Sequence, residues 1–361
     1  MRGALKAAPA AYHGDGAWLP ALLKKMRGRR IAVVGDLMLD EWLWGAVRRI
    51  SPEAPVPVVE VSAHSYTLGG AGNVANNLAA LGAEVSIIGA IGDDDSGAMV
   101  LDLCRRLGAA TQGIVPIRSR PTTRKTRIVA HGQQVVRADR ECTDPIDDRS
   151  RSVMMRAAAK LEGKIDGIIV SDYGKGLISV PLVEAFRALR RTAVITGDPK
   201  PQNIDAFADV DCIAPNAAEV EIATGISVKT DSGMAQAASS LLRRTGCRYV
   251  LVTRGEHGMT LFSDRQVPFT APSVARQVYD VSGAGDTVIS TLTLALAVGA
   301  PIERAVALAT VAAGVVVEKL GTATASAQEI ERFAGGVIVD LKPAPSAADK
   351  PRAAKRRGGA R

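Results

Sequence analysis

The sequence contains no apolar run near the roughly 18 uninterrupted residues that a membrane-spanning helix requires. Its N-terminus lacks the continuous apolar core and the small-residue cleavage site of a secretory signal. The four cysteines are scattered without a C-x-x-C pair, which disfavours both a disulfide framework and a zinc site. We therefore expect a cytoplasmic protein with reduced thiols and no membrane contact.

Several catalytic patterns are absent as well. There is no G-x-x-x-x-G-K-[ST] motif, so the chain is not a P-loop kinase. The four histidines are isolated, which gives little support to a zinc enzyme or a histidine-containing triad. A glycine pattern at 70–75 partly matches a dinucleotide fingerprint, but the acidic residues at 93–94 fall in an expected loop, not at the end of a second strand.

The net charge of +8 is concentrated near the two ends of the sequence. Residues 1–30 carry +6 and residues 341–361 carry another +6, so residues 31–340 are left with −4. A nucleic-acid-binding domain usually has a basic face on its folded body, so nucleic acid is not an expected partner. We interpret 1–27 as an N-terminal extension, 28–340 as one domain and 341–361 as a basic disordered tail.

The body alternates short apolar runs with helical segments, which predicts an α/β fold with a central, mostly parallel sheet flanked by helices. Polar residues follow several of the runs and should gather at the carboxyl edge of that sheet, where such folds bind ligands. Two segments break the alternation, at about 52–62 and 122–141, and are typical of β-ribbon with a hairpin turn at His131-Gly132. We expect them to form a small inserted β lid.

The motif that carries most chemistry is Asp-Val-Ser-Gly-Ala-Gly-Asp-Thr at 280–287, which precedes a long apolar helix. The free N–H groups of the first helical turn form an anion site, and Gly283 and Gly285 allow a phosphoryl group to approach closely. Asp286 would then stand beside the phosphate, where it could accept a proton from an attacking hydroxyl. The alternative is an ordinary acidic residue at a helix N-terminus.

Two further motifs precede this one, Leu-Gly-Gly-Ala-Gly-Asn-Val-Ala-Asn at 68–76 and Asn-Ala-Ala-Glu at 216–219. The three together, in this order, resemble the ribokinase-like (phosphofructokinase-B) family of carbohydrate kinases over about residues 28–335. The stretches GDLMLDEWLWG, RISPEAPVPVVEV, IVSDYGKG and DPK are similar to the branch that phosphorylates D-glycero-β-D-manno-heptose 7-phosphate. That branch is often fused to a nucleotidyltransferase with an H-x-G-H motif, which is absent here, so we expect the single-function form.

The resemblance implies ATP-dependent phosphorylation of the heptose 7-phosphate at its anomeric oxygen, giving the 1,7-bisphosphate for ADP-heptose and lipopolysaccharide core synthesis. It implies ATP and Mg²⁺ as cofactors and leaves a monovalent cation open. Asp286 matches the family's catalytic base, and the N–H groups of Gly283, Ala284 and Gly285 match its anion hole. A kinase for another sugar or sugar phosphate is the alternative within the fold, and a binding protein that uses its basic tails is the alternative outside it.

The nucleotide side has its own matching positions. Asn216 and Glu219 match a motif that organises Mg²⁺ through water, although the same spacing forms a helix-capping box. Gly321 matches a turn beside adenine and is also consistent with a helix C-cap. The full set of expected nucleotide-binding residues is Asp198, Lys200, Asn216, Glu219, Thr253, Gly255, Gly283, Gly285 and Gly321.

The sugar side is expected to use carboxylates and amides, which bind hydroxyls in fixed directions. For Asp40, the alternative interpretation is a residue that only forms a turn. Basic side chains must meet the 7-phosphate, although a solvated strand face accounts for some of the candidates equally well. The expected substrate-binding residues are Asp36, Asp40, Gly69, Gly70, Asn73, Arg124, Lys125, Arg127, Arg137 and Lys175. Because the edge strands of the ribbon need covering, and the resemblance implies it, we also expect a homodimer.

Overall fold

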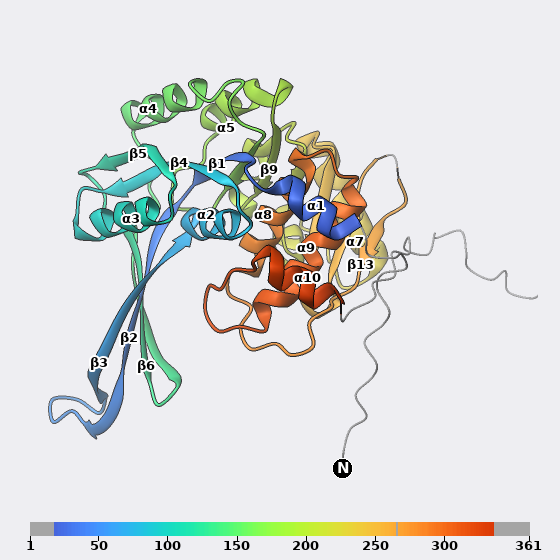
Figure 1. The fold of residues 1–361 in the computed structure, drawn as a ribbon. Helices are drawn as coiled ribbons and strands as arrows, with labels where there is room; N and C mark the ends of the chain where they lie inside the picture. Colours follow the sequence, from blue (N-terminus) through green and yellow to red (C-terminus); the bar gives the residue numbers. More distant parts are fainter. Residues whose placement is uncertain (1–17, 265, 336–361) are drawn as a thin grey trace, which may run out of the picture.

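The computed structural model describes residues 18–264 and 266–335 and has the expected α/β architecture (Figure 1). Its main sheet has nine strands in the order β13-β12-β11-β10-β9-β8-β1-β4-β5, parallel from β11 to β5 and antiparallel at β12 and β13. The strands are β1 (Arg30–Gly35), β4 (Glu84–Gly92), β5 (Ala110–Ile117), β8 (Gly167–Ser171), β9 (Val194–Asp198), β10 (Cys212–Ile213), β11 (Tyr249–Thr253), β12 (Met259–Phe262) and β13 (Phe269–Ala271).

Helices cover both faces of this sheet, because alternate side chains of its strands are apolar and point to opposite sides. Ile31 and Val33 of β1 belong to one buried cluster, with residues of α2, α8 and α9, whereas Ala32 and Val34 belong to a second one, with residues of α4, α5 and α7. In Figure 1, α4 and α5 accordingly lie on the opposite side of the sheet from α2 and α8. The helices are α1 (Trp18–Met26), α2 (Ala71–Ala80), α3 (Asp95–Arg106), α4 (Asp148–Ala159), α5 (Val180–Arg187), α6 (Ala217–Thr224), α7 (Asp231–Thr245), α8 (Ala284–Ala297), α9 (Ile302–Val317) and α10 (Ala327–Gly335), with 3₁₀ turns η1 (Ala188–Arg191), η2 (Pro201–Phe207) and η3 (Gly255–His257).

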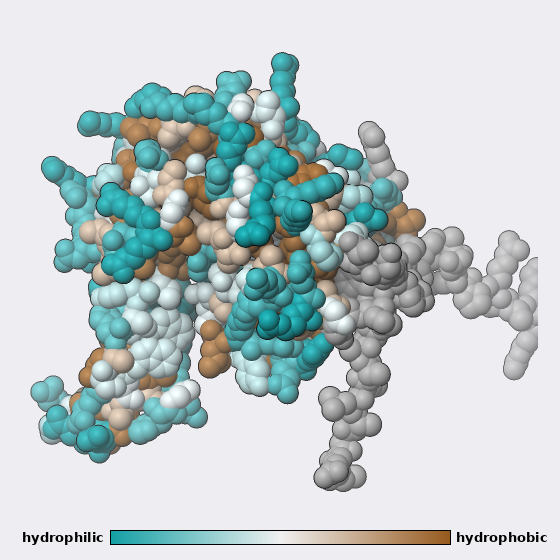
Figure 2. Space-filling model, in the orientation of Figure 1, coloured by the Kyte–Doolittle hydropathy of each residue, from teal (hydrophilic) through white to brown (hydrophobic). Residues whose placement is uncertain are grey.

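A second sheet of four strands, in the order β3-β2-β6-β7, projects from the body as the lid (Figure 1). The predicted ribbon is present in β3 (Pro57–Gly70), β6 (Thr123–Ala130) and β7 (Gln133–Arg140), and the last two are joined at His131-Gly132, both with positive φ. The sequence did not predict β2 (Leu37–Ile50), which pairs antiparallel with β3 and parallel with β6. The lid is therefore larger than expected, and Figure 2 shows hydrophobic residues exposed on it.

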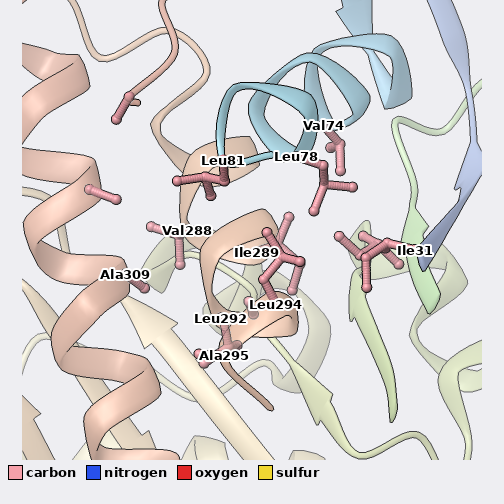
Figure 3. Close-up of a cluster of buried hydrophobic side chains, with 14 of the residues drawn as sticks. Ile31, Val74, Leu78, Leu81, Val288, Ile289, Leu292, Leu294, Ala295 and Ala309 are labelled. Carbon is pink, nitrogen blue, oxygen red and sulfur yellow. The ribbon is translucent and has the colours of Figure 1, made fainter. Parts of the chain in front are cut away.

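Helices α2 and α8 pack side by side, with α2 over β1 and α8 over β8 and β9, and Figure 3 shows buried side chains between the two helices. Val74 and Leu78 of α2 meet Ile289 and its neighbours on α8. Two hydrogen bonds add polar contacts at the same interface. Thr287 Oγ1 donates to Asn77 Oδ1 (2.7 Å), and Asn77 Nδ2 donates to the Asn73 carbonyl (2.9 Å). This packing joins the first and third sequence motifs, with the buried side chain of Asn77 between them.

The ends of the described chain bear on the predicted domain limits. Residues Trp18–Met26, inside the predicted N-terminal extension, form α1, and Leu23 and Met26 are buried in the core. These residues belong to the folded body. Residues 1–17 and the predicted tail at 341–361 lie outside the described residues. Among the helices of the described part, none is long and apolar enough to cross a membrane.

Candidate active site

Polar side chains gather at the carboxyl edge of the main sheet, as the alternation of the sequence predicts. Asp36 directly follows β1, Asp172 follows β8, and Asp198 ends β9. Asn216 comes soon after β10 and bridges to Thr253, the last residue of β11. Neighbouring strands thus each contribute one polar group to the same edge, and the N-terminus of α8 packs against β8 and β9 beside them.

Asp286 lies in the first turn of α8 and is buried, with 4% of its surface exposed. Asn73 Nδ2 of α2 donates to one of its carboxylate oxygens (2.6 Å), and the Tyr173 hydroxyl donates to the other (2.7 Å). Burial raises the pKa of Asp286 to about 6, while these two hydrogen bonds and the charge of Lys200 oppose the rise. Asp286 is thus an acid in the first turn of a helix, as the alternative has it, but it is buried and held by two other elements.

The N-terminus of α8 has the features of an anion site. Gly283 precedes the helix with φ +78°, and the first-turn amides of a helix have no partner within it. The Ala284 amide instead donates to the Val281 carbonyl (3.2 Å). A Cβ on Gly285 would lie 4.0 Å from a carboxylate oxygen of Asp198, so the turn opens toward the end of β9.

Asp36 is the buried carboxylate on the other side of Tyr173. It accepts the backbone N–H groups of Tyr173 (2.8 Å) and Lys175 (3.1 Å) through one oxygen. Burial raises its pKa to about 6 despite these two bonds. Arg120 also holds this loop in place, by donating to the Lys175 carbonyl (2.5 Å). The predicted residues Asp36 and Asp286 are therefore both attached to one short loop, 172–176.

Asp40 lies within strand β2, so the turn-forming interpretation of this residue is wrong. Its carboxylate pairs with Arg127 of β6 (2.6 Å), and both side chains are largely buried. A Cβ on Gly69 would lie 2.7 Å from Asp40 Oδ2, which explains why glycine occupies that position. Gly70 has φ +56° and begins α2, so the glycine turn brings β3, Asp40 and Asn73 together at the base of the lid.

The lid register sorts four of the five candidate phosphate-binding cations, those that lie on β6 and β7. Paired residues of neighbouring strands share a face, and successive residues alternate. Lys125 pairs with Asp40 in register, and Arg127 and Arg137 pair with each other, so all three lie on the face of Asp40. Arg124 lies on the opposite face and pairs with Glu41 (3.5 Å).

Each cation on the Asp40 side already has a carboxylate partner. Lys125 pairs with Asp139 (3.0 Å), and Arg137 pairs with the same aspartate (2.9 Å). Lys175, in the loop after β8, pairs with Glu141 (2.8 Å). Arg137 is about half exposed, but Lys125 and Lys175 are mostly buried, at 18% and 16%. The solvated-face alternative therefore suits Arg137 better than the two lysines.

The nucleotide side contains a dense group of charges. The Lys200 ammonium pairs with Glu219 and lies over the Tyr173 ring, 5.5 Å from its centre. Burial alone would lower the pKa of Lys200, but the hydrogen bond to Glu219 and the charge of Asp198 raise it. Burial raises the pKa of Asp198 to about 8. The site thus combines a firmly charged lysine with a carboxyl that binds its proton tightly.

Asn216 and Glu219 form the capping box of α6, which confirms the structural alternative for this motif. Asn216 Oδ1 accepts the Glu219 amide, and Glu219 Oε2 accepts the Asn216 amide, both at 2.9 Å. In the described residues, no group of three or more His, Cys, Asp or Glu side chains is arranged to hold a metal ion. With its oxygens engaged in this way, the motif suits an ion held mainly by phosphates and water.

The remaining predicted turns also reach this edge. Gly255 follows β11 with φ +56°, and no atom lies within 4 Å of a Cβ built on it. The Gly321 amide donates to Asp280 (3.0 Å), which also accepts the Ser282 amide (2.9 Å), so Asp280 joins the 321 turn to the anion site. Helix α9 ends earlier, with Glu318 as its C-cap, so the alternative in which Gly321 is the helix C-cap is wrong.

Sequence reasoning missed Arg120 and Tyr173, and it placed Asp172 at the sheet edge without giving it a role in the site. Asp172 is fully buried and accepts hydrogen bonds from the Gly174 amide (2.8 Å), the Lys200 amide (2.9 Å) and the Asn203 side chain (3.0 Å). Arg120 donates to the Lys175 carbonyl of this loop, and the Tyr173 hydroxyl of the same loop donates to Asp286. For Tyr173 the sequence signal was its place in the polar, glycine-punctuated loop after a strand, whereas Arg120 is far from this loop in the sequence and gave no such signal.

The fold and the three assembled turns define a carbohydrate kinase of the ribokinase type. Residues 29–329 match the pfkB family carbohydrate kinases, and the chain belongs to this family. Among solved structures, it resembles Arabidopsis thaliana ribokinase complexed with ribose and ATP (TM-score 0.66, 18% identity, 85% of this chain and 98% of that one). It also resembles Escherichia coli phosphofructokinase-2 in complex with potassium (TM-score 0.71, 16% identity, 86% and 99%). At these identities the likeness establishes the fold.

Curated relatives of the chain indicate which branch of the family it resembles. The chain is 45% identical over 304 residues to the bifunctional protein HldE of Desulfatibacillum aliphaticivorans, which covers 84% of this chain and 62% of that protein. It is 43% identical over 317 residues to the bifunctional protein HldE of Pelobacter propionicus, covering 86% and 64%. The chain thus spans less than two thirds of the length of these relatives.

Proposed function

We propose that the protein transfers the γ-phosphoryl group of ATP to the anomeric hydroxyl of D-glycero-β-D-manno-heptose 7-phosphate, giving the 1,7-bisphosphate for ADP-heptose synthesis. The observation that carries the proposal is the buried Asp286 at the N-terminus of α8, held by Asn73 and Tyr173 beside the anion turn. The similarity to HldE proteins and the heptose-kinase sequence stretches support the choice of sugar. A cytoplasmic location belongs to the proposal, supported by four free cysteines.

The reaction follows from the positions of these groups. Asp286 accepts the proton of the anomeric hydroxyl, and that oxygen forms a bond to the γ-phosphorus. The bond from the γ-phosphorus to the β–γ bridging oxygen breaks, and ADP leaves with that oxygen. The first-turn N–H groups of α8 stabilise the charge on the transferred group. With a pKa of about 6, Asp286 is mostly ionised at neutral pH and can accept the proton.

ATP would bind over the Asp198–Glu219 side of the site, with Lys200 facing its phosphates. Bound Mg²⁺ supplies positive charge that offsets the charge of the phosphates. Asn216 and Glu219 suit contacts to this ion through water, since their oxygens already serve the capping box and Lys200. A monovalent-cation requirement is open to a direct comparison of turnover in potassium and sodium salts.

The sugar's hydroxyls would meet Asp36 and Asp40, and its 7-phosphate would meet cations of the lid and of the 172–176 loop. Arg127 and Lys125 share the face of Asp40, and Lys175 lies beside Asp36. Because arginine can bind phosphate through two N–H groups, Arg127 is the favoured contact, with its partner Asp40 free to turn to the sugar.

Turnover of purified protein with ATP tests the proposal, comparing the heptose 7-phosphate with ribose, fructose 6-phosphate and adenosine. We expect kcat/KM to be highest for the heptose 7-phosphate. Efficient use of ribose or adenosine in place of the heptose would reject the sugar. In parallel, Asp286→Asn should keep ATP binding and lower turnover by about 10²–10⁴. Near-normal turnover of Asp286→Asn would remove this residue from the role of base.

We further propose that the lid pairs with that of a second copy of the chain. β3 and β7 are the edge strands of the lid sheet, and edge strands are usually covered. Val61 of β3 and Val136 of β7 expose 52% and 49% of their surface, which supports an apolar interface. Sedimentation at micromolar concentration should give a dimer, and replacing Val61 and Val136 by glutamate should give a monomer. A monomeric parent protein would contradict the proposal.

A further inference from the structure

Tyr173 occupies an unusual position between the two carboxylates expected to handle the sugar. Its hydroxyl donates to Asp286 (2.7 Å), while its backbone N–H donates to Asp36 (2.8 Å). The Lys200 ammonium lies over its ring, 5.5 Å from the centre. One residue thus touches the predicted base, the predicted sugar-binding carboxylate and the lysine of the nucleotide side.

The loop that carries Tyr173 is held at several points, so its hydroxyl has a defined place. Asp172, fully buried, accepts the Gly174 amide (2.8 Å), and Arg120 donates to the Lys175 carbonyl (2.5 Å). Gly174 has φ +66°, which gives the backbone a sharp turn directly after the tyrosine. A side chain fixed in this way can orient the Asp286 carboxylate to which it donates, instead of moving with it.

On Asp286, the two donors act on different oxygens. Asn73 Nδ2 binds one and the Tyr173 hydroxyl binds the other, so together they fix the plane of the carboxylate. Each carboxylate oxygen retains lone pairs for an incoming hydroxyl. Burial and the nearby Asp286 raise the pKa of Tyr173 well above 10, so the phenol stays protonated and can donate to Asp286.

We propose that Tyr173 is a positioning residue for the catalytic base: its hydroxyl orients Asp286 and keeps it ionised, and its backbone links that base to Asp36. The inference rests on the proposed role of Asp286. It assigns to the S-D-Y-G-K-G loop a function in the chemical step that is separate from sugar or phosphate binding.

The proton affinity of Asp286 depends on all the groups around it. Asn73 approaches from α2, Tyr173 from the loop after β8, Lys200 from the segment after β9 and Asp40 from β2. Asp198, at the end of β9, also senses the charge of Asp286. Of these, only Asn73 and Tyr173 donate hydrogen bonds to the carboxylate, so removing the phenol takes away one of two direct donors.

The test is Tyr173→Phe in the full chain, with Tyr249→Phe as the matched control. Tyr249 lies on β11 in the core, so its variant loses the same hydroxyl away from the site. A hydroxyl that donates to a carboxylate favours the ionised form, so its loss raises the pKa of Asp286. We expect Tyr173→Phe to lower kcat about tenfold or more, change the sugar KM less than threefold, and move the acidic limb of the kcat profile up by about one pH unit.

A second variant covers the case in which Tyr173→Phe does not fold, as judged by its melting temperature. Replacing Tyr173 by 3-fluorotyrosine keeps the ring and the hydroxyl but makes the hydroxyl a stronger donor, so the acidic limb should move to lower pH. An unchanged limb in the folded variants, or a higher sugar KM without a limb shift, would overturn the inference. Asp286→Asn is assayed alongside, because near-normal turnover there would reject the proposed base itself, independently of Tyr173.

Discussion

Gly283 offers a sharp test of how the first and third motifs cooperate. Its φ of +78° lies in the left-handed region, and a Cβ built on it would lie only 2.7 Å from Asn73 Nδ2. Gly283→Ala therefore has two consequences. Backbone strain should lower the free energy of unfolding by roughly 1–2 kcal/mol, and the methyl group should push Asn73 away from Asp286, to which it donates at 2.6 Å. A hydrogen bond to a charged group contributes about 1.5–3 kcal/mol, so turnover should fall roughly 10- to 100-fold.

Gly299, at the other end of α8, provides the control. It has φ +75°, but no atom lies within 4 Å of a Cβ built there, so Gly299→Ala adds strain without displacing a site residue. Thermal unfolding should show a similar decrease in Tm of a few degrees for both variants, whereas steady-state turnover should fall only in Gly283→Ala. Equal turnover in two equally destabilised variants would refute the idea that Asn73 holds the base.

Three further predictions concern the rest of the site. Turnover of the parent protein should decrease as the pH falls through about 6, because protonation of Asp286 removes the base; a flat kcat profile from pH 5 to 8 would contradict this. Asn216→Ala should cost about 1 kcal/mol of stability by removing the α6 cap. Asn216→Asp keeps the cap, so a higher KM for ATP in this variant would show that Asn216 contributes to nucleotide binding apart from capping. Arg127→Met should raise the sugar-phosphate KM at least tenfold, and Arg124→Met, on the opposite lid face, should raise it less; the reverse order in steady-state kinetics would refute the face assignment.

The sequence was sufficient for the parts of the site that depend on local pattern. The apolar runs ended where the strands end, so Asp36 and Asp198 could be placed at one edge of the sheet without any structure. The glycines at 283 and 285 indicated a helix N-terminus, and α8 begins at Ala284. Spacing also predicted the capping box of α6, because a box depends only on residues three positions apart.

The parts that depend on pairing between distant segments could not be predicted in this way. β2 contains Asp, Glu, Arg and two tryptophans, which do not alternate like a typical half-buried strand, so its role in the lid was not apparent. Alternation along β6 places Arg124 and Arg127 on opposite faces, but which of them shares the face of Asp40 depends on the β2–β6 register, which no local pattern encodes. Tyr173 was missed for the same reason, since its contact with Asp286 spans 113 positions in the chain.

The two carboxyl groups that flank the anion turn show why burial matters to this chemistry. Asp286 has two hydrogen-bond donors and a pKa of about 6, whereas no donor among the described residues binds the Asp198 side chain, whose pKa is about 8. Between these values Asp286 is ionised, as a base must be, and Asp198 is largely neutral. The Asp198 side chain faces Gly285 in the anion turn, where the phosphates would bind. In its neutral form it repels an incoming polyphosphate less than a carboxylate would. Burial raises the pKa of both acids, but hydrogen bonds from Tyr173 and Asn73 oppose the rise at Asp286, whereas the neighbouring carboxylates of Glu219, Asp286 and Asp172 add to it at Asp198, so each acid has the charge its position requires.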